Sequence, residues 1–288
     1  MDQNRFMPRL CFALTAALAL LGAVLRAVCM LTAFDESVGY FNKGLLPTLS
    51  AVLYFAGALH PILCAAFIPK NTLPNTLHTR LRLPAAFLWG LSLIVFAVFG
   101  TMYLLDVKAL GITPITAVRY LPVLLALPAS LYFFLSGNRQ TDRYPDWLSL
   151  VGFLPVLWCV LSVAETYTDQ FTAMNSPIKI GLQLGFVGLT LILTSELRFR
   201  LGKPLPRAAV ALMGIGATLA LNGSIPVLVG TGARVLDNDL HMLYAVVLLC
   251  GGLYGLYVLL QYTCLPAPAC ESAETTQFPA APESPTAE

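Results

Sequence analysis

Long apolar runs without any charged residue recur along this sequence at a regular length. Stretches free of Asp, Glu, Lys and Arg cover 10–25, 44–69, 83–105, 120–138, 147–164, 180–195, 208–233 and 240–270. Each run is rich in Leu, Val, Ala, Phe and Ile and shows no alternation of apolar and polar positions. Helices that cross a membrane need about 20 apolar residues, whereas barrel strands are about ten residues long and alternate. The pattern therefore predicts eight transmembrane helices.

We place these helices at 10–33, 46–68, 84–105, 120–136, 147–166, 179–197, 207–229 and 240–262. The loops between them are short, so we expect one all-α, polytopic membrane domain over 1–263. From 264 to 288 the chain is rich in Pro, Ala and Glu and has no Lys or Arg. Such a segment cannot bury enough apolar surface to fold, so we expect a disordered, acidic cytoplasmic tail.

Composition excludes the soluble classes of protein. Hydrophobic residues make up 57% of the 288 residues, charged residues only 11%, and the mean hydropathy is +0.75. Soluble domains carry roughly 25% charged residues. The formal net charge of +2 offers no basic surface for nucleic acid. The expected surroundings are the lipid bilayer, with a small solute or another membrane protein as the partner.

Lys and Arg are distributed unequally over the predicted loops, and this bias predicts the orientation. Eleven lie in segments on the side of the N-terminus: Arg5, Arg9, Lys70, Arg80, Arg82, Arg139, Arg143, Arg198, Arg200, Lys203 and Arg207. Five lie on the opposite side: Lys43, Lys108, Arg119, Lys179 and Arg234. Both termini are therefore expected in the cytoplasm. Short loops without an outer Asn-x-Ser/Thr site favour a bacterial plasma membrane as the location.

The two halves of the chain, 1–138 and 139–263, show similarities in the same order. Asp35 follows the first span and Asp169 the fifth, and an Arg-x-Arg-Leu sequence precedes both the third and the seventh span. Four spans per half would make such a repeat parallel, with its axis along the membrane normal. Basic inner turns and acidic outer ends also arise from the charge rules alone, so the 4+4 duplication is a hypothesis.

Arg26 is the one charge placed well inside a predicted span, in its outer half. A charge at the bilayer centre costs about 2.5–3.5 kcal/mol on insertion scales, and less toward a helix end. Two interpretations follow. The side chain either extends outward beside Asp35 and Glu36, or it points inward and pairs with Glu165, which ends the fifth span at a similar depth.

The seventh predicted span contains Asn222, Ser224 and Pro226 within one turn and a half. Proline lacks an N–H and clashes with the carbonyl four residues back, so we expect a break in this helix. Asn222 and Ser224 either satisfy the freed backbone groups locally or line a cavity and face a solute. Because Asn222 lies at the depth of Arg26, the candidate solute-binding or buried polar cluster is Arg26, Glu165, Asn222 and Ser224.

His60 is a weaker polar candidate in the inner half of the second span. A proton relay would need an acidic neighbour at that depth, and the sequence offers none, so a hydrogen-bonded interior histidine is the simpler interpretation. Five of the seven cysteines lie in spans, where a free thiol behaves as a small apolar group. The three histidines are scattered, so no metal site is expected.

Small residues and a capping sequence refine the packing prediction. The pairs Gly181/Gly185 and Gly251/Gly255 each place two glycines on one helix face, which lets helices approach closely within the chain. The sequence Asn175-Ser176-Pro177 is typical of a helix start, with Asn or Ser as the N-cap and Pro in the first turn.

Motifs of enzyme chemistry and of cofactor binding are missing from the sequence, among them the phosphate loop, His-Glu-x-x-His and Gly-x-Ser-x-Gly. We therefore expect a non-enzymatic membrane component, either a sensor or a partner subunit. A small-solute carrier with a site in the outer half is the alternative, and an intramembrane enzyme is a second, weaker one. A water-filled cavity lined by Arg26, Glu165 and Asn222 would favour the carrier, and a filled bundle centre would favour the sensor or subunit.

Overall fold

The computed structural model describes residues 6–69, 72–75, 77, 82–108, 114–137, 145–169 and 172–264. Within these residues, eight helical segments are long and apolar enough to cross a membrane, which confirms the predicted number of spans. The helices are α1 Phe6–Thr32, α2 Leu45–Phe67, α3 Arg82–Lys108, α4 Pro114–Gly137, α5 Asp146–Val151, α6 Phe153–Thr168, α7 Pro177–Arg200, α8 Pro206–Gly232 and α9 Asp239–Cys264. The protein is an all-α integral membrane protein. The predicted tail over 264–288 lies outside the described residues, except for Cys264 at the end of α9.

The fifth predicted span consists of two helices, α5 and α6, joined at Gly152. Pro155 has no N–H to donate to the carbonyl of Val151, so the backbone bond that would bridge the two helices is missing. A Cβ at Gly152 would lie 2.4 Å from Leu197 Cδ2, so the glycine also allows this turn to approach α7. The two helices together still cover the length of one span, 146–168.

Helix α8 forms the centre of the bundle and packs against α1, α2, α7 and α9. No large hydrophobic side chain of α8 is exposed. Its closest approach is to α7, because a Cβ at Gly216 would lie 2.4 Å from the Gly188 carbonyl and one at Gly223 would lie 2.4 Å from the Gly181 carbonyl. Glycines therefore set the spacing of the central helices, as the sequence predicted for Gly181.

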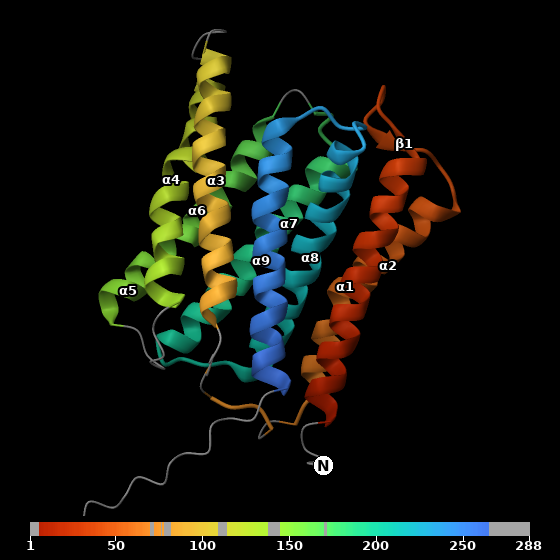
Figure 1. The fold of residues 1–288 in the computed structure, drawn as a ribbon. Coiled ribbons are helices and arrows are strands. Elements are labelled where there is room, and N and C mark those ends of the chain that lie inside the picture. The colour runs from red at the N-terminus through yellow and green to blue at the C-terminus, as the bar shows by residue number, and fades with distance from the viewer. Residues whose placement is uncertain are drawn as a thin grey trace, which may run out of the picture.

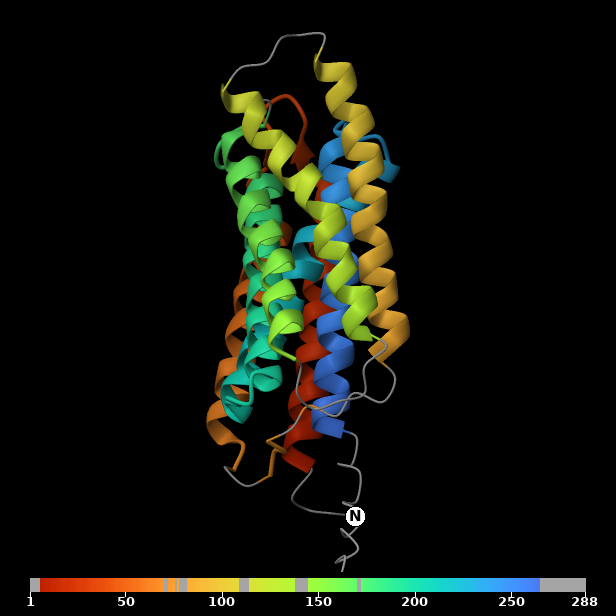
Figure 2. The same cartoon turned by 90° about the vertical axis from the view of Figure 1, so that its left-hand side faces the viewer.

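Two helix pairs flank this centre (Figure 1). Helices α1 and α2 pack together on one side of α8, while α3 packs against α4 and α9 on the other side, and α4 continues the contact to α6 (Figure 2). The flanks expose large apolar side chains such as Phe55, at 62%, and Leu124, at 69%. In water such exposure would be unfavourable, so these faces are the ones that contact lipid.

The two ends of the bundle differ in structure. Helix α1 begins and α9 ends at the same end, where Arg9 Nη2 donates to the Cys264 carbonyl oxygen at 3.4 Å. We call this the terminal end. The opposite, loop end carries a short antiparallel hairpin of β1 (Phe34–Asp35) and β2 (Tyr40–Phe41), in which Phe34 pairs with Phe41. Gly39 makes its turn with φ +76°, a conformation that suits glycine.

The start of α7 lies at the loop end and follows the predicted capping pattern. Ser176 is the N-cap, and its side chain accepts a hydrogen bond from the backbone N–H of Ile178 at 3.3 Å. Pro177 occupies the first helical turn, where its missing N–H costs nothing. This confirms the predicted helix start and fixes the backbone that faces Arg26.

Candidate functional site

Five ionisable side chains from four helices and one helix end meet beneath the loop end of the bundle. They are Arg119 of α4, Glu165 of α6, Asp169 at the C-cap of α6, Lys179 of α7 and His241 of α9. Each is at most 7% exposed. We call them the buried ion cluster. With a neutral histidine the two cations balance the two anions, so the cluster buries charge without burying net charge.

Asp169 is the hub of the buried ion cluster. Its Oδ1 lies 3.3 Å from Arg119 Nη2, and its Oδ2 lies 3.4 Å from His241 Nε2. The Thr172 hydroxyl donates to Oδ2 at 2.7 Å, and Lys179 Nζ donates to the Asp169 backbone carbonyl at 2.7 Å. One residue at the end of α6 therefore ties α4, α7 and α9 together. Removing its carboxylate would leave buried partners without their counter-charge.

Glu165 extends the buried ion cluster one turn deeper into the bundle. Its Oε1 lies 3.7 Å from Arg119 Nε, so Arg119 bridges both carboxylates of α6. Tyr244 of α9 is a close neighbour of Glu165. The polar contacts therefore run from His241 through Asp169 and Arg119 to Glu165 and Tyr244.

A polar cavity of about 510 Å³ opens at the loop end, directly above the buried ion cluster. It is lined by the hairpin between α1 and α2, by the segment before α7 and by the loop between α8 and α9. Charged side chains of both signs face it, including Glu36, Asp237 and Arg234. His241 lines this cavity and also contacts Asp169, so it connects the two parts of the site. We call this space the loop-end cavity.

Arg234 lines the loop-end cavity with an unusual backbone conformation. Its φ of 60° lies in the left-handed region, which costs a non-glycine residue about 1–2 kcal/mol. Its N–H donates to the Thr231 carbonyl at 3.0 Å, and the N–H of Val235 donates to the Gly230 carbonyl at 2.8 Å. This closing pattern normally has glycine at the left-handed position. Side-chain function in the cavity would explain an arginine there.

The centre of the bundle below Glu165 is filled with aromatic side chains. The ring of Tyr244 lies 4.8 Å from that of Phe96 and 5.1 Å from that of Phe186, measured between centroids. Nearer the terminal end, the Trp89 ring packs on Phe133 and Tyr254 at 4.3 and 5.1 Å. All of these side chains are fully buried. The polar contacts of the loop end therefore meet a packed apolar layer.

A third buried carboxylate, Glu196 of α7, lies beyond the aromatic layers. The Tyr254 hydroxyl donates to its Oε2 at 2.6 Å, and the Tyr132 hydroxyl lies 3.5 Å from its Oε1. The side chain is 0% exposed. At 1.5 Å per residue, Glu196 is about 25 Å along α7 from Lys179 of the buried ion cluster.

Arg26 points into the bundle, but it does not pair with Glu165. Its Nη2 donates to the Pro177 carbonyl at 2.5 Å, and its guanidinium lies 5.0 Å from the centroid of the Tyr54 ring. Gly181 leaves room for it, since a Cβ there would lie 3.3 Å from Arg26 Nη2. The inward orientation was one of the two interpretations of the sequence. The proposed partner was wrong, because Glu165 Oε1 lies 3.7 Å from Arg119 Nε instead.

Asn222 and Ser224 lie in a continuous helix, so the predicted break in α8 is wrong. Helix α8 passes through Pro226 without interruption. Asn222 Nδ2 donates to the carbonyls of Thr218, at 2.9 Å, and Ala19, at 3.2 Å, while the Ser224 hydroxyl donates to the Leu221 carbonyl at 3.3 Å. Asn222 and Ser224 thus use their side chains in hydrogen bonds to nearby backbone carbonyls, which was one of the two alternatives that the sequence left open. The four residues of the candidate cluster thus separate, with Glu165 in the buried ion cluster.

Asn222 nevertheless packs against α1 at Gly22, one turn before Arg26. A Cβ at Gly22 would lie 2.8 Å from Asn222 Oδ1, and Arg26 follows one turn later. Asn222 Oδ1 is buried without a hydrogen-bond partner. His60, the weaker candidate, lies on α2 beside the Cys64 thiol, far along the bundle from the loop end.

Four residues of the buried ion cluster were missed as site residues: Arg119, Asp169, Lys179 and His241. Each was assigned to a loop or a span end, where charge is expected on the surface. The signal that could have identified them is their common depth, since all four lie within three residues of a predicted outer span end. Opposite charges at one level on different helices are candidates for pairing.

Comparisons with known proteins do not add a function to this geometry. No family model matches the chain, and neither a curated protein nor a solved structure matches it. No group of three or more His, Cys, Asp or Glu side chains in the described part of the chain is placed to hold a metal ion. The functional interpretation therefore depends on the loop-end cavity and the buried ion cluster.

Proposed function

We propose that the protein is a non-enzymatic membrane sensor that binds a small polar solute in the loop-end cavity. The observation that carries this proposal is the double contact of His241. This side chain lines the cavity and lies 3.4 Å from Asp169 in the buried ion cluster. A solute that contacts the imidazole therefore acts on a direct neighbour of Asp169, the residue that joins the end of α6 to α4, α7 and α9.

The physical basis of sensing is a shift between two arrangements of these helices. A ligand changes such an equilibrium only by its difference in affinity for the two states. A solute that draws His241 toward the cavity would weaken its contact with Asp169 and change the balance of charges around Arg119. Because charge pairs in a dry interior interact strongly, a small displacement there has a large effect on helix packing. Another membrane protein that contacts the lipid-facing helices is the expected receiver of this change.

The lining of the cavity indicates the class of solute. Glu36 and Asp237 offer negative charge, while Arg234 and His241 offer donors for an anionic group. A volume of about 510 Å³ is within the range of small-molecule sites. A small zwitterionic or multiply hydroxylated solute fits both the charge pattern and the size.

A carrier for such a solute is the second candidate, and Glu196 is the observation that favours it. A buried carboxylate with two tyrosine hydroxyls lies toward the terminal end, beyond the aromatic layers. Polar groups on both sides of an apolar layer are consistent with alternating access. The filled aromatic centre favours the sensor instead, since a carrier would have to open between Tyr244 and Tyr254.

Two assays on one preparation distinguish these functions. The full-length protein in lipid nanodiscs is screened by thermal unfolding against amino acids, sugars and small carboxylates. A sensor is stabilised by at least one solute, because binding to the native state raises its stability. The same solute, radiolabelled, is then tested for uptake into proteoliposomes. Binding without uptake supports the sensor, uptake supports the carrier, and neither binding nor uptake contradicts both.

We further propose that the terminal end faces the cytoplasm and the loop end faces outward across a plasma membrane. Eleven Lys and Arg residues of the terminal-end segments against five of the loop-end segments support this orientation. Reporter fusions after residues 75 and 172 test it. Cytoplasmic signal at 75 and external signal at 172 agree with the proposal, and the reverse pattern contradicts it.

A further inference from the structure

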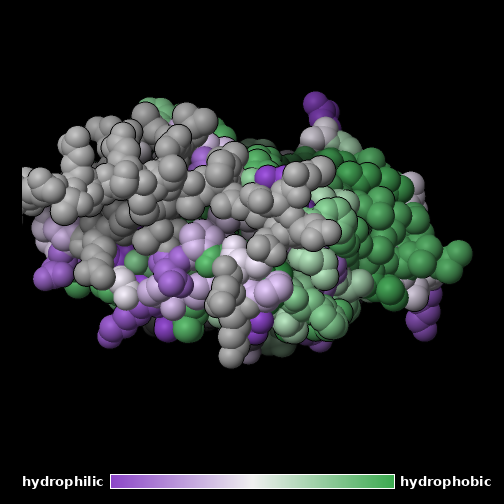
Figure 3. Space-filling model, turned by 90° about the horizontal axis from the view of Figure 1, so that it is seen from below, coloured by the Kyte–Doolittle hydropathy of each residue, from purple (hydrophilic) through white to green (hydrophobic). Residues whose placement is uncertain are grey.

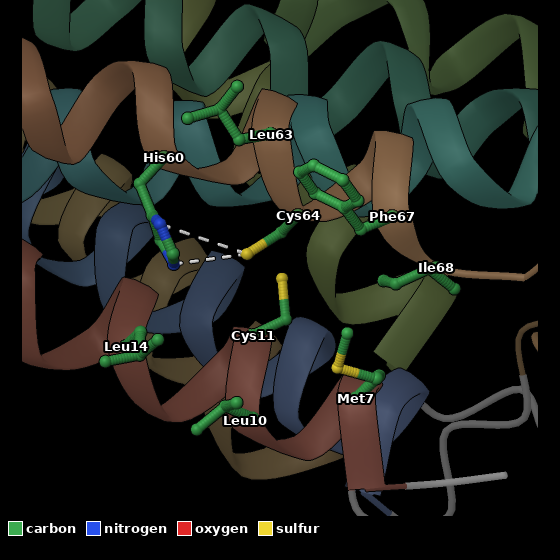
Figure 4. Close-up of a pocket in the computed structure, with 9 residues that line it drawn as sticks. All are labelled: Met7, Leu10, Cys11, Leu14, His60, Leu63, Cys64, Phe67 and Ile68. Atoms are coloured by element: carbon green, nitrogen blue, oxygen red, sulfur yellow. Dashed lines mark hydrogen bonds between the residues drawn. The ribbon is translucent and has the colours of Figure 1, made fainter.

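A second, apolar pocket lies between α1 and α2 near the terminal end (Figure 4). Its volume is about 250 Å³. The lining is apolar apart from three groups that carry chemistry, which are the thiols of Cys11 and Cys64 and the imidazole of His60. The proposed sensor function uses none of these groups.

The pocket opens toward the lipid-facing side of the bundle. Two of its lining residues, Leu63 and Phe67, are 59% and 72% exposed on α2. Seen from the terminal end, hydrophobic residues cover the side of the molecule on which α1 and α2 lie (Figure 3). A molecule that reaches this pocket therefore comes from the hydrocarbon of the bilayer.

The two thiols face each other across the helix pair. Figure 4 shows Cys11 of α1 and Cys64 of α2 with their sulfur atoms directed toward one another. Neither residue is in a disulfide. A disulfide forms only between cysteines whose Cβ atoms are close and whose side chains point together. Cys11 and Cys64 have this orientation and line the same pocket.

His60 provides a proton acceptor for one thiol. Its Nε2 lies 3.2 Å from Cys64 Sγ, one helical turn away on α2. The thiolate, not the thiol, is the attacking species in disulfide chemistry. A base at this distance can take the proton from a thiol in apolar surroundings and so form the thiolate. Three reactive groups thus converge on one pocket that lipid can enter.

We propose that Cys11 and Cys64 form a redox pair that a lipid-soluble quinone oxidises from within the bilayer. Two S–H bonds break and one S–S bond forms between the sulfur atoms. The pair loses two electrons and two protons, and the quinone gains both and leaves as the hydroquinone. His60 accepts the proton of Cys64 and passes it to a quinone oxygen. The resulting disulfide joins α1 to α2.

The class of oxidant follows from the pocket. An apolar lining excludes charged oxidants, and the opening toward lipid excludes those dissolved only in water. The volume is smaller than that of a drug-sized site and suits one substituted ring. A quinone ring has carbonyl oxygens that accept hydrogen bonds from a thiol or an imidazole, and it takes up two electrons and two protons.

The test uses the reduced full-length protein in proteoliposomes with decyl-substituted benzoquinone as the probe. We expect one hydroquinone per protein and one disulfide, which mass spectrometry of alkylated peptides assigns to Cys11 and Cys64. Cys11→Ser and Cys64→Ser each abolish both signals, whereas Cys29→Ser, a substitution of a buried thiol elsewhere on α1, leaves them unchanged. His60→Gln slows the reaction about 100-fold, the range of a lost general base.

Pocket access has a control of its own. Leu63→Trp fills the opening, so it should slow oxidation by the quinone. Failure of the wild-type protein to reduce the quinone overturns the proposal. So does a disulfide that forms with the quinone at equal rate in Leu63→Trp, because the oxidant would then not use this pocket.

Discussion

His241 Nε2 lies 3.4 Å from Asp169 Oδ2, and this contact joins the start of α9 to the end of α6 across the loop end of the bundle. The same imidazole lines the loop-end cavity. Asp169 also contacts Arg119. A displacement of His241 on α9 can therefore affect Asp169 at the end of α6 and, through it, Arg119 on α4. The sensor proposal depends on this connection.

Substitution of the hub should destabilise the protein strongly. Asp169→Asn keeps the size of the side chain but removes the charge that faces Arg119 and His241. Breaking a buried ion pair by removing one partner costs about 3–5 kcal/mol, and thermal unfolding in nanodiscs measures the loss. Asp237→Asn, at an exposed residue of the same cavity, is the matched control and should change stability by at most about 0.5 kcal/mol. Equal stability of the two variants would show that the buried ion cluster does not hold the helices.

Coupling between residues should follow the contacts of the structure. Arg119→Ala and Glu165→Ala remove two sides of one interaction, so their effects on unfolding should be non-additive by about 0.5–3 kcal/mol. Arg26→Ala and Glu165→Ala should be additive within about 0.5 kcal/mol, since these residues have separate partners. A double-mutant cycle on each pair measures both. If Glu165 were coupled to Arg26 and not to Arg119, the result would contradict the pairing described above.

Helix contacts at the bundle centre should not tolerate a methyl group. In Gly223→Ala the new Cβ would lie 2.4 Å from the Gly181 carbonyl, which is backbone and cannot rotate away. Overpacking of this kind costs about 1–3 kcal/mol, or more where backbone must move. Gly232→Ala on the same helix meets nothing within 4 Å and should leave the unfolding temperature unchanged or slightly higher. A destabilisation that is the same for both would contradict the close approach of α7 and α8.

Arg234 should lower the stability of the protein but strengthen solute binding. Two residues after the end of α7 lies Gly202 at φ 71°, whereas two residues after the end of α8 lies Arg234 at φ 60°, in the same hydrogen-bond pattern. Arg234→Gly should therefore stabilise the protein by about 1 kcal/mol and weaken binding of the solute that the cavity takes. Thermal unfolding and equilibrium binding measure the two effects. If Arg234→Gly left binding unchanged, the arginine would have no role in the cavity.

The hairpin at the cavity edge should show a defined pH response. The Ser37 hydroxyl donates to Asp35 Oδ1 at 2.6 Å, and the Ser37 N–H donates to it at 3.0 Å, which lowers the pKa of Asp35 below its usual value. The stabilisation is present above the ordinary carboxyl pKa and is lost as the pH falls through the lowered one. Ser37→Ala should raise the pKa, as carbon-13 NMR of the carboxyl group would detect, while Ser37→Thr should retain it. An unchanged pKa in Ser37→Ala would contradict the hydroxyl contact.

The helices were predictable from the sequence because lipid imposes a strict rule on length and polarity. The part of the chain that the structure describes contains eight helical segments able to cross a membrane, one for each predicted span, and Ser176 caps α7 as the sequence indicated. The division of the fifth span at Gly152 was not predicted, although Pro155 was present as a signal. Proline had opposite outcomes at two places, since α8 continues through Pro226. Whether a proline interrupts a helix depends on how the neighbouring helices pack around it, and that packing could not be read from the sequence.

Counting residues along each span predicted how deep a side chain lies in the membrane, but not which neighbouring helix it faces. Arg26 and Glu165 were assigned a similar level, yet Arg26 contacts Pro177 of α7 whereas Glu165 contacts Arg119 of α4. The partner of Glu165 came from α4, where Arg119 had been counted as a loop charge. Cys11 and Cys64 were interpreted as separate apolar residues for the same reason. The 4+4 duplication stays a prediction.

The central claim is that a solute in the loop-end cavity acts on the buried ion cluster through His241. The most direct measurement is equilibrium binding, in nanodiscs, of the first solute that stabilises the wild-type protein, compared between the wild type and Asp169→Asn. Asp169 does not line the cavity, but it holds His241, so we predict that the substitution weakens binding at least about tenfold, or by about 1.4 kcal/mol. Equal affinity in the two proteins would mean that the cavity and the buried ion cluster are independent, and it would contradict the account.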